Sequence, residues 1–172
     1  MEEGKNMSGS IFHTDKYSFR LVEKNDCDLL FNWRNADNVR LMLFHSDKIP
    51  YENHVAWFNK MLLDQGRKYF IFEINKMSVG IINFSNFKKE DKSADWGFYI
   101  GKTGLSKGTG SMMCELGVGL AKKYLDIKNI YALILLTNEK SISIHEKLLF
   151  KKLEESRNAQ GKSYFTYKLE LK

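Results

Sequence analysis

Apolar residues recur with helical spacing in two segments of the first third of the chain. One face of the first segment carries Leu29, Leu30 and Trp33. Asn25 and Asp28, three residues apart, resemble a capping signal for its start. The second segment follows Pro50, and its stripe at steps of three and four residues consists of His54, Trp57, Phe58, Met61 and Leu62. Both patterns predict amphipathic helices whose apolar faces lie mostly in a core.

Aromatic and β-branched runs predict strands in much of the remaining sequence. The runs cover residues 19–22, 69–74, 79–84 and 94–100. Polar or glycine-containing turns at 75–78 and 88–93 predict that the last three strands are antiparallel neighbours.

The C-terminal third predicts a strand, a short helix and a hairpin. The continuous apolar run 130–136 is typical of a strand covered on both faces. Asn138 is placed to cap a helix over 140–149, and residues 151–155 and 163–171 predict the closing hairpin. Strands and helices thus alternate in the manner of an α/β (α+β) domain.

A glycine-rich turn separates the strand 94–100 from a long helix. Gly108 and Gly110 lack a Cβ, so the turn can adopt positive φ angles and backbone N–H groups can approach an anion. The helix that follows, with Leu116 and Leu120 on one face, adds the positive end of its dipole. The combination predicts a cradle for a pyrophosphate, with an ordinary tight turn as the alternative.

A length of 172 residues, 43% of them hydrophobic, predicts one globular domain with its own core. We expect this domain to span residues 18–172 and the polar residues 1–17 to form a poorly ordered head. The two cysteines lie far apart and the four histidines lack a ligand spacing, so neither disulfides nor a metal site is indicated. Since no secretory signal or bilayer-length apolar run is evident, we expect a soluble cytoplasmic protein without a membrane partner.

The net charge of +6 restricts the class of partner. Lysines are scattered through every segment rather than gathered in one arm or helix, which argues against a nucleic acid partner. A basic balance suits an enzyme that handles polyanionic small molecules such as nucleotides.

Two motifs resemble those of the GNAT superfamily of acetyl-CoA-dependent N-acetyltransferases. The first family motif, Arg/Gln-x-x-Gly-x-Gly/Ala, corresponds to residues 105–110, which keep both glycines but begin with Leu105. The second corresponds in spacing to Asn138, Ser141, His145, Lys147, Leu149 and Phe150. The order of elements agrees over nearly the whole chain after residue 18. The resemblance implies a twisted, mixed but mostly antiparallel sheet of about seven strands, splayed in the middle and flanked by about four helices.

The resemblance also implies acetyl-CoA as co-substrate, without a metal. The pantetheine arm would add to the backbone edge of residues 96–100, where they splay from 130–136, and the pyrophosphate would lie on 107–111. The implied cofactor-binding residues are Phe98, Tyr99, Ile100, Lys107, Gly108, Thr109, Gly110, Ser111, Asn138, Ser141 and Lys147. For Lys107 and Ser111 the alternative is a solvated turn.

Amide formation from an amine and a thioester needs a proton for the departing thiolate. His145 occupies the position where most relatives carry the tyrosine that supplies this proton, and an imidazole can serve as the catalytic acid. The alternative is a helix-surface residue without a catalytic role. Leu133 stands where some relatives place a carboxylate base, so no base is assigned. A water relay to the backbone, Ser85, Asn83 or His54 stays open.

Within the superfamily, the chain resembles the branch that acetylates the 4-amino group of a UDP-linked 4-amino-4,6-dideoxy-N-acetyl sugar on the route to pseudaminic acid. The resemblance is carried by residues 31–35, 42, 54, 57–58, 69–72, 80 and 96–99. It implies direct attack of the amine on the thioester. The implied substrate-binding residues are Arg34, Met42, His54, Trp57, Asn83, Ser85 and Trp96.

Several alternatives stay open at this point. Acetyltransferases of the RimJ/RimL type share a similar first helix, so acetylation of a protein N-terminus or a small amine is one alternative. A non-catalytic acetyl-CoA-binding module is another, because the consensus tyrosine is missing. Arg34 alternatively pairs with Asp37, and His54 and Trp57 are alternatively core residues. Pairing of the last strand across a two-fold axis would give a homodimer.

Overall fold

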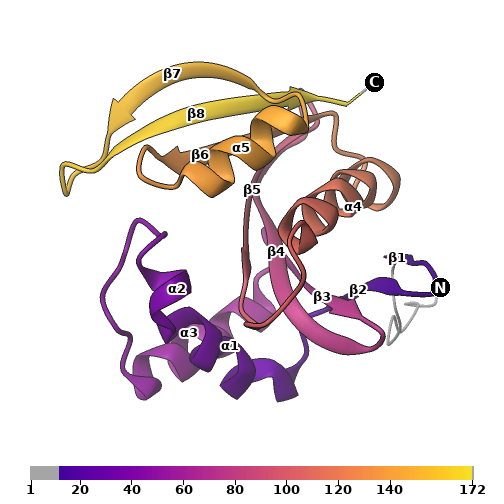
Figure 1. Ribbon diagram of the computed structural model, residues 1–172, viewed down its shortest axis with the longest axis vertical. Coiled ribbons are helices and arrows are strands. Elements are labelled where there is room, and N and C mark those ends of the chain that lie inside the picture. Colours follow the sequence, from indigo (N-terminus) through magenta and orange to yellow (C-terminus); the bar gives the residue numbers. More distant parts are fainter. Residues whose placement is uncertain (1–11, 172) are drawn as a thin grey trace.

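The computed structural model describes residues 12–171, which form one eight-stranded sheet with helices on both faces (Figure 1). The strands are β1 (Phe12–His13), β2 (Tyr17–Leu21), β3 (Lys68–Ile74), β4 (Met77–Lys88), β5 (Ser93–Ile100), β6 (Asn129–Leu135), β7 (Lys151–Arg157) and β8 (Ser163–Glu170). The helices are α1 (Cys27–Asn35), α2 (Asp37–Arg40), α3 (Tyr51–Leu63), α4 (Thr109–Tyr124) and α5 (Glu139–Lys147), with a 3-10 turn over Lys24–Asp26.

The sheet is open in its middle. Its strand order is β1-β2-β3-β4-β5-β6-β8-β7, and every neighbouring pair is antiparallel except β5 with β6. The parallel pair is in register only over Ser93–Asp95 and Asn129–Tyr131, beyond which the strands separate. The predicted splayed, mostly antiparallel sheet is therefore confirmed. With the two-residue β1 it has eight strands rather than about seven.

Side-chain alternation along β3 and β4 gives the sheet two buried faces. Phe70, Phe72 and Ile82 belong to the main core, which includes α4. Ile71 and Ile81 belong to a second core with the apolar sides of α1 and α3. The sheet therefore separates α4 from α1 and α3.

The sheet begins before the predicted domain boundary at residue 18. Residues 1–11 lie outside the described part of the chain, so for them the expected head stays a prediction. Phe12–His13 pairs with β2, and Tyr17, which the sequence assigned to the head, is the first residue of β2.

The start of α1 also differs from the predicted capping by Asn25 and Asp28. Glu23 and Asp26 form a capping box around the 3-10 turn instead, with the Glu23 N–H donating to Asp26 Oδ2 at 2.8 Å. The Arg20 guanidinium holds the same carboxylate through contacts of 2.7 and 2.8 Å. This ion pair with β2 fixes Asp26, and α1 begins at the next residue.

The remaining helices agree more closely with the sequence. Asn138 is the N-cap of α5, and its side chain accepts from the Ser141 N–H at 3.2 Å, so the predicted cap is confirmed. The short α2 was not expected. Within residues 12–171 no helix combines the length and apolar character needed to cross a membrane.

Candidate active site

A groove follows the open edge of β5, and we call it the β5-edge groove. It has a volume of about 770 Å³ and is bordered by α2 and by the first turns of α4 and α5. Ten of the eleven predicted cofactor-binding residues line it: Phe98, Tyr99, Ile100, Lys107, Gly108, Gly110, Ser111, Asn138, Ser141 and Lys147. An unpaired strand edge and two helix starts therefore meet along one groove.

Backbone N–H groups at the start of α4 are free to bind an anion in this groove. Gly108 caps the helix with a φ of 91°, and a Cβ at this residue would meet nothing within 4 Å. The Met112 N–H bonds to the Gly108 carbonyl at 2.9 Å, but the N–H groups of Gly110 and Ser111 have no partner in the described chain. Together with the helix dipole they form an anion site.

The charged side chains that line the β5-edge groove also favour an anionic ligand. Four lysines and a single carboxylate side chain line it: Lys102, Lys107, Lys140, Lys147 and Glu139. The excess of positive charge favours a polyanionic ligand over a neutral or cationic one.

Thr109 differs from the other predicted cofactor-binding residues because it does not line the groove. Its N–H and its hydroxyl both donate to the Ser106 carbonyl, at 3.3 and 2.8 Å. Thr109 therefore closes the turn that presents Gly108 and Gly110.

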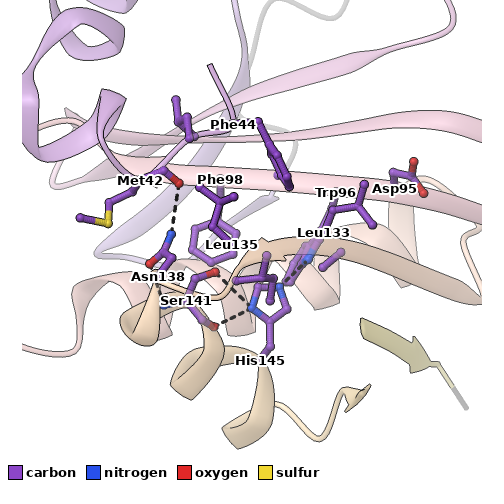
Figure 2. A pocket seen from close by; sticks show the side chains of 14 residues that line it. Met42, Phe44, Asp95, Trp96, Phe98, Leu133, Leu135, Asn138, Ser141 and His145 are labelled. Atoms are coloured by element: carbon purple, nitrogen blue, oxygen red, sulfur yellow. Dashed lines mark hydrogen bonds between the residues drawn. The ribbon is translucent and has the colours of Figure 1, made fainter. Parts of the chain in front are cut away.

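A second cavity, the splay cavity, lies between the separated parts of β5 and β6 and has a volume of about 250 Å³ (Figure 2). His145 of α5 lines it and is only 2% exposed, so the helix-surface alternative does not hold. Trp96 Nε1 donates to His145 Nε2 at 3.0 Å, and His145 Nδ1 contacts the Ser141 carbonyl at 2.7 Å. Since a carbonyl only accepts, the ring carries its proton on Nδ1.

These contacts determine the charge of His145. Burial lowers its pKa to about 4, because the charged ring would lose its hydration. A proton on Nε2 would also face the Trp96 N–H. At neutral pH the ring is therefore uncharged and both of its nitrogens are engaged. The predicted role of His145 as an acid stays a prediction.

A third cavity of about 470 Å³ lies on the face of the sheet that carries α1 and α3, and we call it the α1–α3 cavity. Four of the predicted substrate-binding residues line it: Arg34, His54, Trp57 and Asn83. Leu43, Gly97 and Phe98 line both this cavity and the splay cavity. The two cavities therefore border the same part of β5, and we call Leu43, Gly97 and Phe98 their junction.

The other three predicted substrate-binding residues lie elsewhere. Met42 lines the β5-edge groove and the splay cavity. Trp96 lines the splay cavity as a largely buried member of the main core, held by its bond to His145. Ser85 lines none of the three cavities and pairs with Asp95 across β4 and β5.

Arg34 is the most unusual polar group of the α1–α3 cavity. Its Nη2 donates to the His45 carbonyl at 2.5 Å, whereas Nη1 is the one buried side-chain nitrogen or oxygen without a partner in the described chain. Burial lowers the pKa of this guanidinium. The alternative pairing with Asp37 is not formed, because Asp37 accepts from Arg40 at 2.9 Å. Arg34 thus has an unused donor beside the cavity that it lines, although Nη1 itself is covered by protein atoms.

Residues 41–50, a segment in which the sequence assigned a role only to Met42, contribute Met42, Leu43, Phe44, His45 and Ile49 to the linings of the cavities. Lys162, from the turn between β7 and β8, donates to the Phe44 carbonyl at 2.8 Å and to Ser46 Oγ at 3.2 Å. Asn138 donates to the Met42 carbonyl at 3.4 Å (Figure 2). The segment places Leu43 at the junction, and sequence reasoning missed this residue because the segment has no periodicity.

Comparison with known proteins identifies the family. The chain matches the model of the acetyltransferase (GNAT) domain over residues 17–151. Acetyltransferase PseH of Campylobacter jejuni subsp. jejuni serotype O:23/36 (strain 81-176) is 24% identical over 141 residues, which cover 82% of this chain and 87% of that protein.

Solved structures agree with this match. Spermidine N-acetyltransferase from Vibrio cholerae, in complex with CoA and spermine, has a TM-score of 0.81 at 16% identity and covers 91% of this chain and 96% of its own. Campylobacter jejuni N-acetyltransferase PseH has a TM-score of 0.68 at 18% identity and covers 91% of this chain and 99% of its own. At these identities the structures support the fold alone.

The chain belongs to the GNAT family of acetyltransferases, and it is an N-acetyltransferase. Among named proteins it is similar to PseH at low identity.

Proposed function

We propose that the protein transfers the acetyl group of acetyl-CoA to the 4-amino group of a UDP-linked 4-amino-4,6-dideoxy-N-acetyl sugar, in pseudaminic acid biosynthesis. The observation that carries this proposal is the charge of the α1–α3 cavity. Arg34 supplies a positive charge to the lining, and none of the described residues that line the cavity is an Asp or Glu. Such a lining suits an acceptor that carries a diphosphate and opposes a polyamine or a basic N-terminus, whose ammonium groups need carboxylates. The similarity to PseH is in agreement.

Acetyl-CoA fits the β5-edge groove by the chemistry of the lining. The N–H groups of Gly110 and Ser111 would hold the pyrophosphate, and the lysines would neutralise the remaining phosphate charge. The backbone of residues 96–100, which has no strand partner towards β6, would take the pantetheine arm as an added strand. When bound, acetyl-CoA supplies an electrophilic thioester carbonyl and a thiolate leaving group.

The junction at Leu43, Gly97 and Phe98 would allow an amine in the α1–α3 cavity to attack a thioester in the splay cavity directly. His145 would act on the sulfur through Nδ1–H after this group turns away from the Ser141 carbonyl. A neutral imidazole that gave up its only proton would become an imidazolate. We therefore assign to His145 a hydrogen bond that stabilises the leaving sulfur, while the attacking nitrogen supplies the proton.

Binding of UDP tests the substrate assignment without any turnover. Titration calorimetry should detect UDP binding to the wild-type protein, and Arg34→Gln should weaken this binding about tenfold or more, because a charge-assisted hydrogen bond is lost. Acetyl-CoA affinity should not change. Arg157→Gln is the matched control, since Arg157 is exposed, donates to Ser163 Oγ and lines none of the three cavities. Equal UDP affinity of both variants, or no binding by the wild type, would contradict the proposal.

A further inference from the structure

We propose that His54 is the general base: its Nδ1 takes one proton from the ammonium group of the acceptor, directly or through one water, before the nitrogen attacks the thioester. This inference rests on the proposed function in one respect, namely that the acceptor amine enters the α1–α3 cavity. It does not depend on which sugar carries that amine.

The hydrogen bonds of His54 fix the position of its lone pair. Nε2 contacts the carbonyl of Cys27 at 2.9 Å, and because a carbonyl only accepts, Nε2 carries the proton of the neutral ring. Nδ1 is then an acceptor, and it has no hydrogen-bond partner in the described chain. Among the described side-chain nitrogens and oxygens, only Arg34 Nη1 is both fully buried and unpartnered, so Nδ1 is not fully buried. Since His54 lines the α1–α3 cavity, we infer that Nδ1 is reached from this cavity.

Packing holds this ring in place. Its side chain is only 2% exposed, and the rings of Phe31, Trp57 and Phe58 surround it at centroid distances of 5.4, 5.4 and 6.0 Å. A base that is fixed before the substrate binds loses little entropy in the reaction. The ring lines the same cavity as Gly97 and Phe98, where the path to the thioester begins.

The charges of Asp28 and Arg34 on α1 act on the ring, and Tyr51 on α3 binds Asp28. The other titratable residues that line the cavity are His45 in the segment 41–50, Tyr69 on β3 and Tyr99 on β5. Burial is the largest influence and lowers the pKa of His54; the Cys27 carbonyl and Asp28 raise it, and Arg34 lowers it. The ring is therefore neutral at pH 7 and able to accept a proton. Burial keeps Tyr99 protonated by raising its pKa, so this phenol does not compete.

The proton balance is complete without a further reactant. One proton of the ammonium moves to Nδ1, and the nitrogen lone pair forms the C–N bond as the C–S bond breaks. The second proton of the nitrogen leaves with the sulfur, which gives an amide and a free thiol. The His54 imidazolium then returns its proton to solvent.

His54→Gln is the decisive variant because a glutamine amide can keep donating to the Cys27 carbonyl but is not a base. We expect kcat/KM at pH 7 to fall by about 10²–10³-fold, within the range for loss of a general base. Acetyl-CoA affinity should stay unchanged, and the deficit should shrink as the pH approaches the pKa of the acceptor amine. A structural defect would not depend on pH in this way.

Asp28→Asn adds a readout that a structural role of His54 would not produce. Asp28 accepts from the Tyr51 hydroxyl at 2.7 Å, and its charge favours the imidazolium of His54. The acid limb of the kcat/KM profile should therefore move to lower pH in this variant. An unmoved limb would contradict the proposal.

His45→Gln is the comparison within the same cavity, since His45 is exposed and is the rival histidine. A loss with His45→Gln but not with His54→Gln would overturn the proposal, as would a His54→Gln enzyme with wild-type kcat/KM across the pH range. Wild-type protein that releases no thiol with the UDP-linked aminosugar or any other amine would contradict the proposed function itself. The two failures are therefore distinguishable.

Discussion

The buried, uncharged His145 should make folding stability depend on pH in a defined window. A histidine that is neutral in the folded state but titrates with an ordinary pKa of 6.5 in the unfolded chain opposes folding as the pH falls. Above pH 6.5 neither state binds the proton. Between 6.5 and about 4 the unfolded state binds it and the folded state does not, so stability decreases through this window.

The size of the effect follows from the depressed pKa. A pKa lowered from 6.5 to about 4 corresponds to about 3 kcal/mol at full protonation of the unfolded chain. The His145→Gln variant is suited to isolate this contribution, because its amide oxygen can still accept from Trp96 Nε1 while the side chain does not titrate.

Urea unfolding of both proteins at several pH values between 7.5 and 4.5 measures the difference in the free energy of unfolding. The wild-type protein should lose roughly 2–3 kcal/mol relative to His145→Gln over this range. Acidic groups elsewhere contribute equally to both proteins and cancel. A difference constant to within about 0.5 kcal/mol would refute the account of His145 as a ring kept neutral by burial.

Three further perturbations test the site and its supports. Gly108→Ala places a Cβ at a φ of 91°, which should cost about 1–2 kcal/mol of unfolding free energy and weaken acetyl-CoA binding. Gly110→Ala is the control, because its added Cβ makes an ordinary 3.5 Å contact and should preserve stability; equal stabilities of the two variants would contradict this. Gly101→Ala should destabilise by about 1–3 kcal/mol in urea unfolding, because its Cβ would lie 2.1 Å from the Trp33 ring, and wild-type stability would show that reading of the packing to be wrong. Lys162→Met removes the donor to Phe44 and Ser46 and should raise the KM for the acceptor about tenfold in steady-state kinetics, while an unchanged KM would mean that the tether does not shape the site.

Periodicity and turn chemistry were sufficient for most of the fold and for one half of the site. The alternating runs of β3 to β5 and the glycine turn before α4 are local signals, so these strands and the anion cradle could be predicted from neighbouring residues. The cofactor site along the edge of β5 was implied by the family resemblance instead. Asn138 was predictable for the same reason, since a cap acts within three residues.

The other half of the site depends on contacts between distant parts of the chain. Lys162 reaches Phe44 across 118 positions, and no local pattern indicates this bond. The segment 41–50 has neither helical nor strand spacing, so the position of Leu43 at the junction was invisible in the sequence. Thr109 and Ser85 show a second limit: they stand beside true lining residues, but one closes a turn and the other lies beyond the cavity.

Thiol release from acetyl-CoA by the purified protein tests the central claim most directly. The acceptors are the UDP-linked 4-amino-4,6-dideoxy-N-acetyl altrosamine, spermidine and a ribosomal-protein N-terminal peptide, each against a control without acceptor. The account predicts fast release with the nucleotide-linked aminosugar and background rates with the two cationic acceptors, because within residues 12–171 no carboxylate side chain lines the α1–α3 cavity. Release with spermidine or the peptide but not with the aminosugar would contradict it.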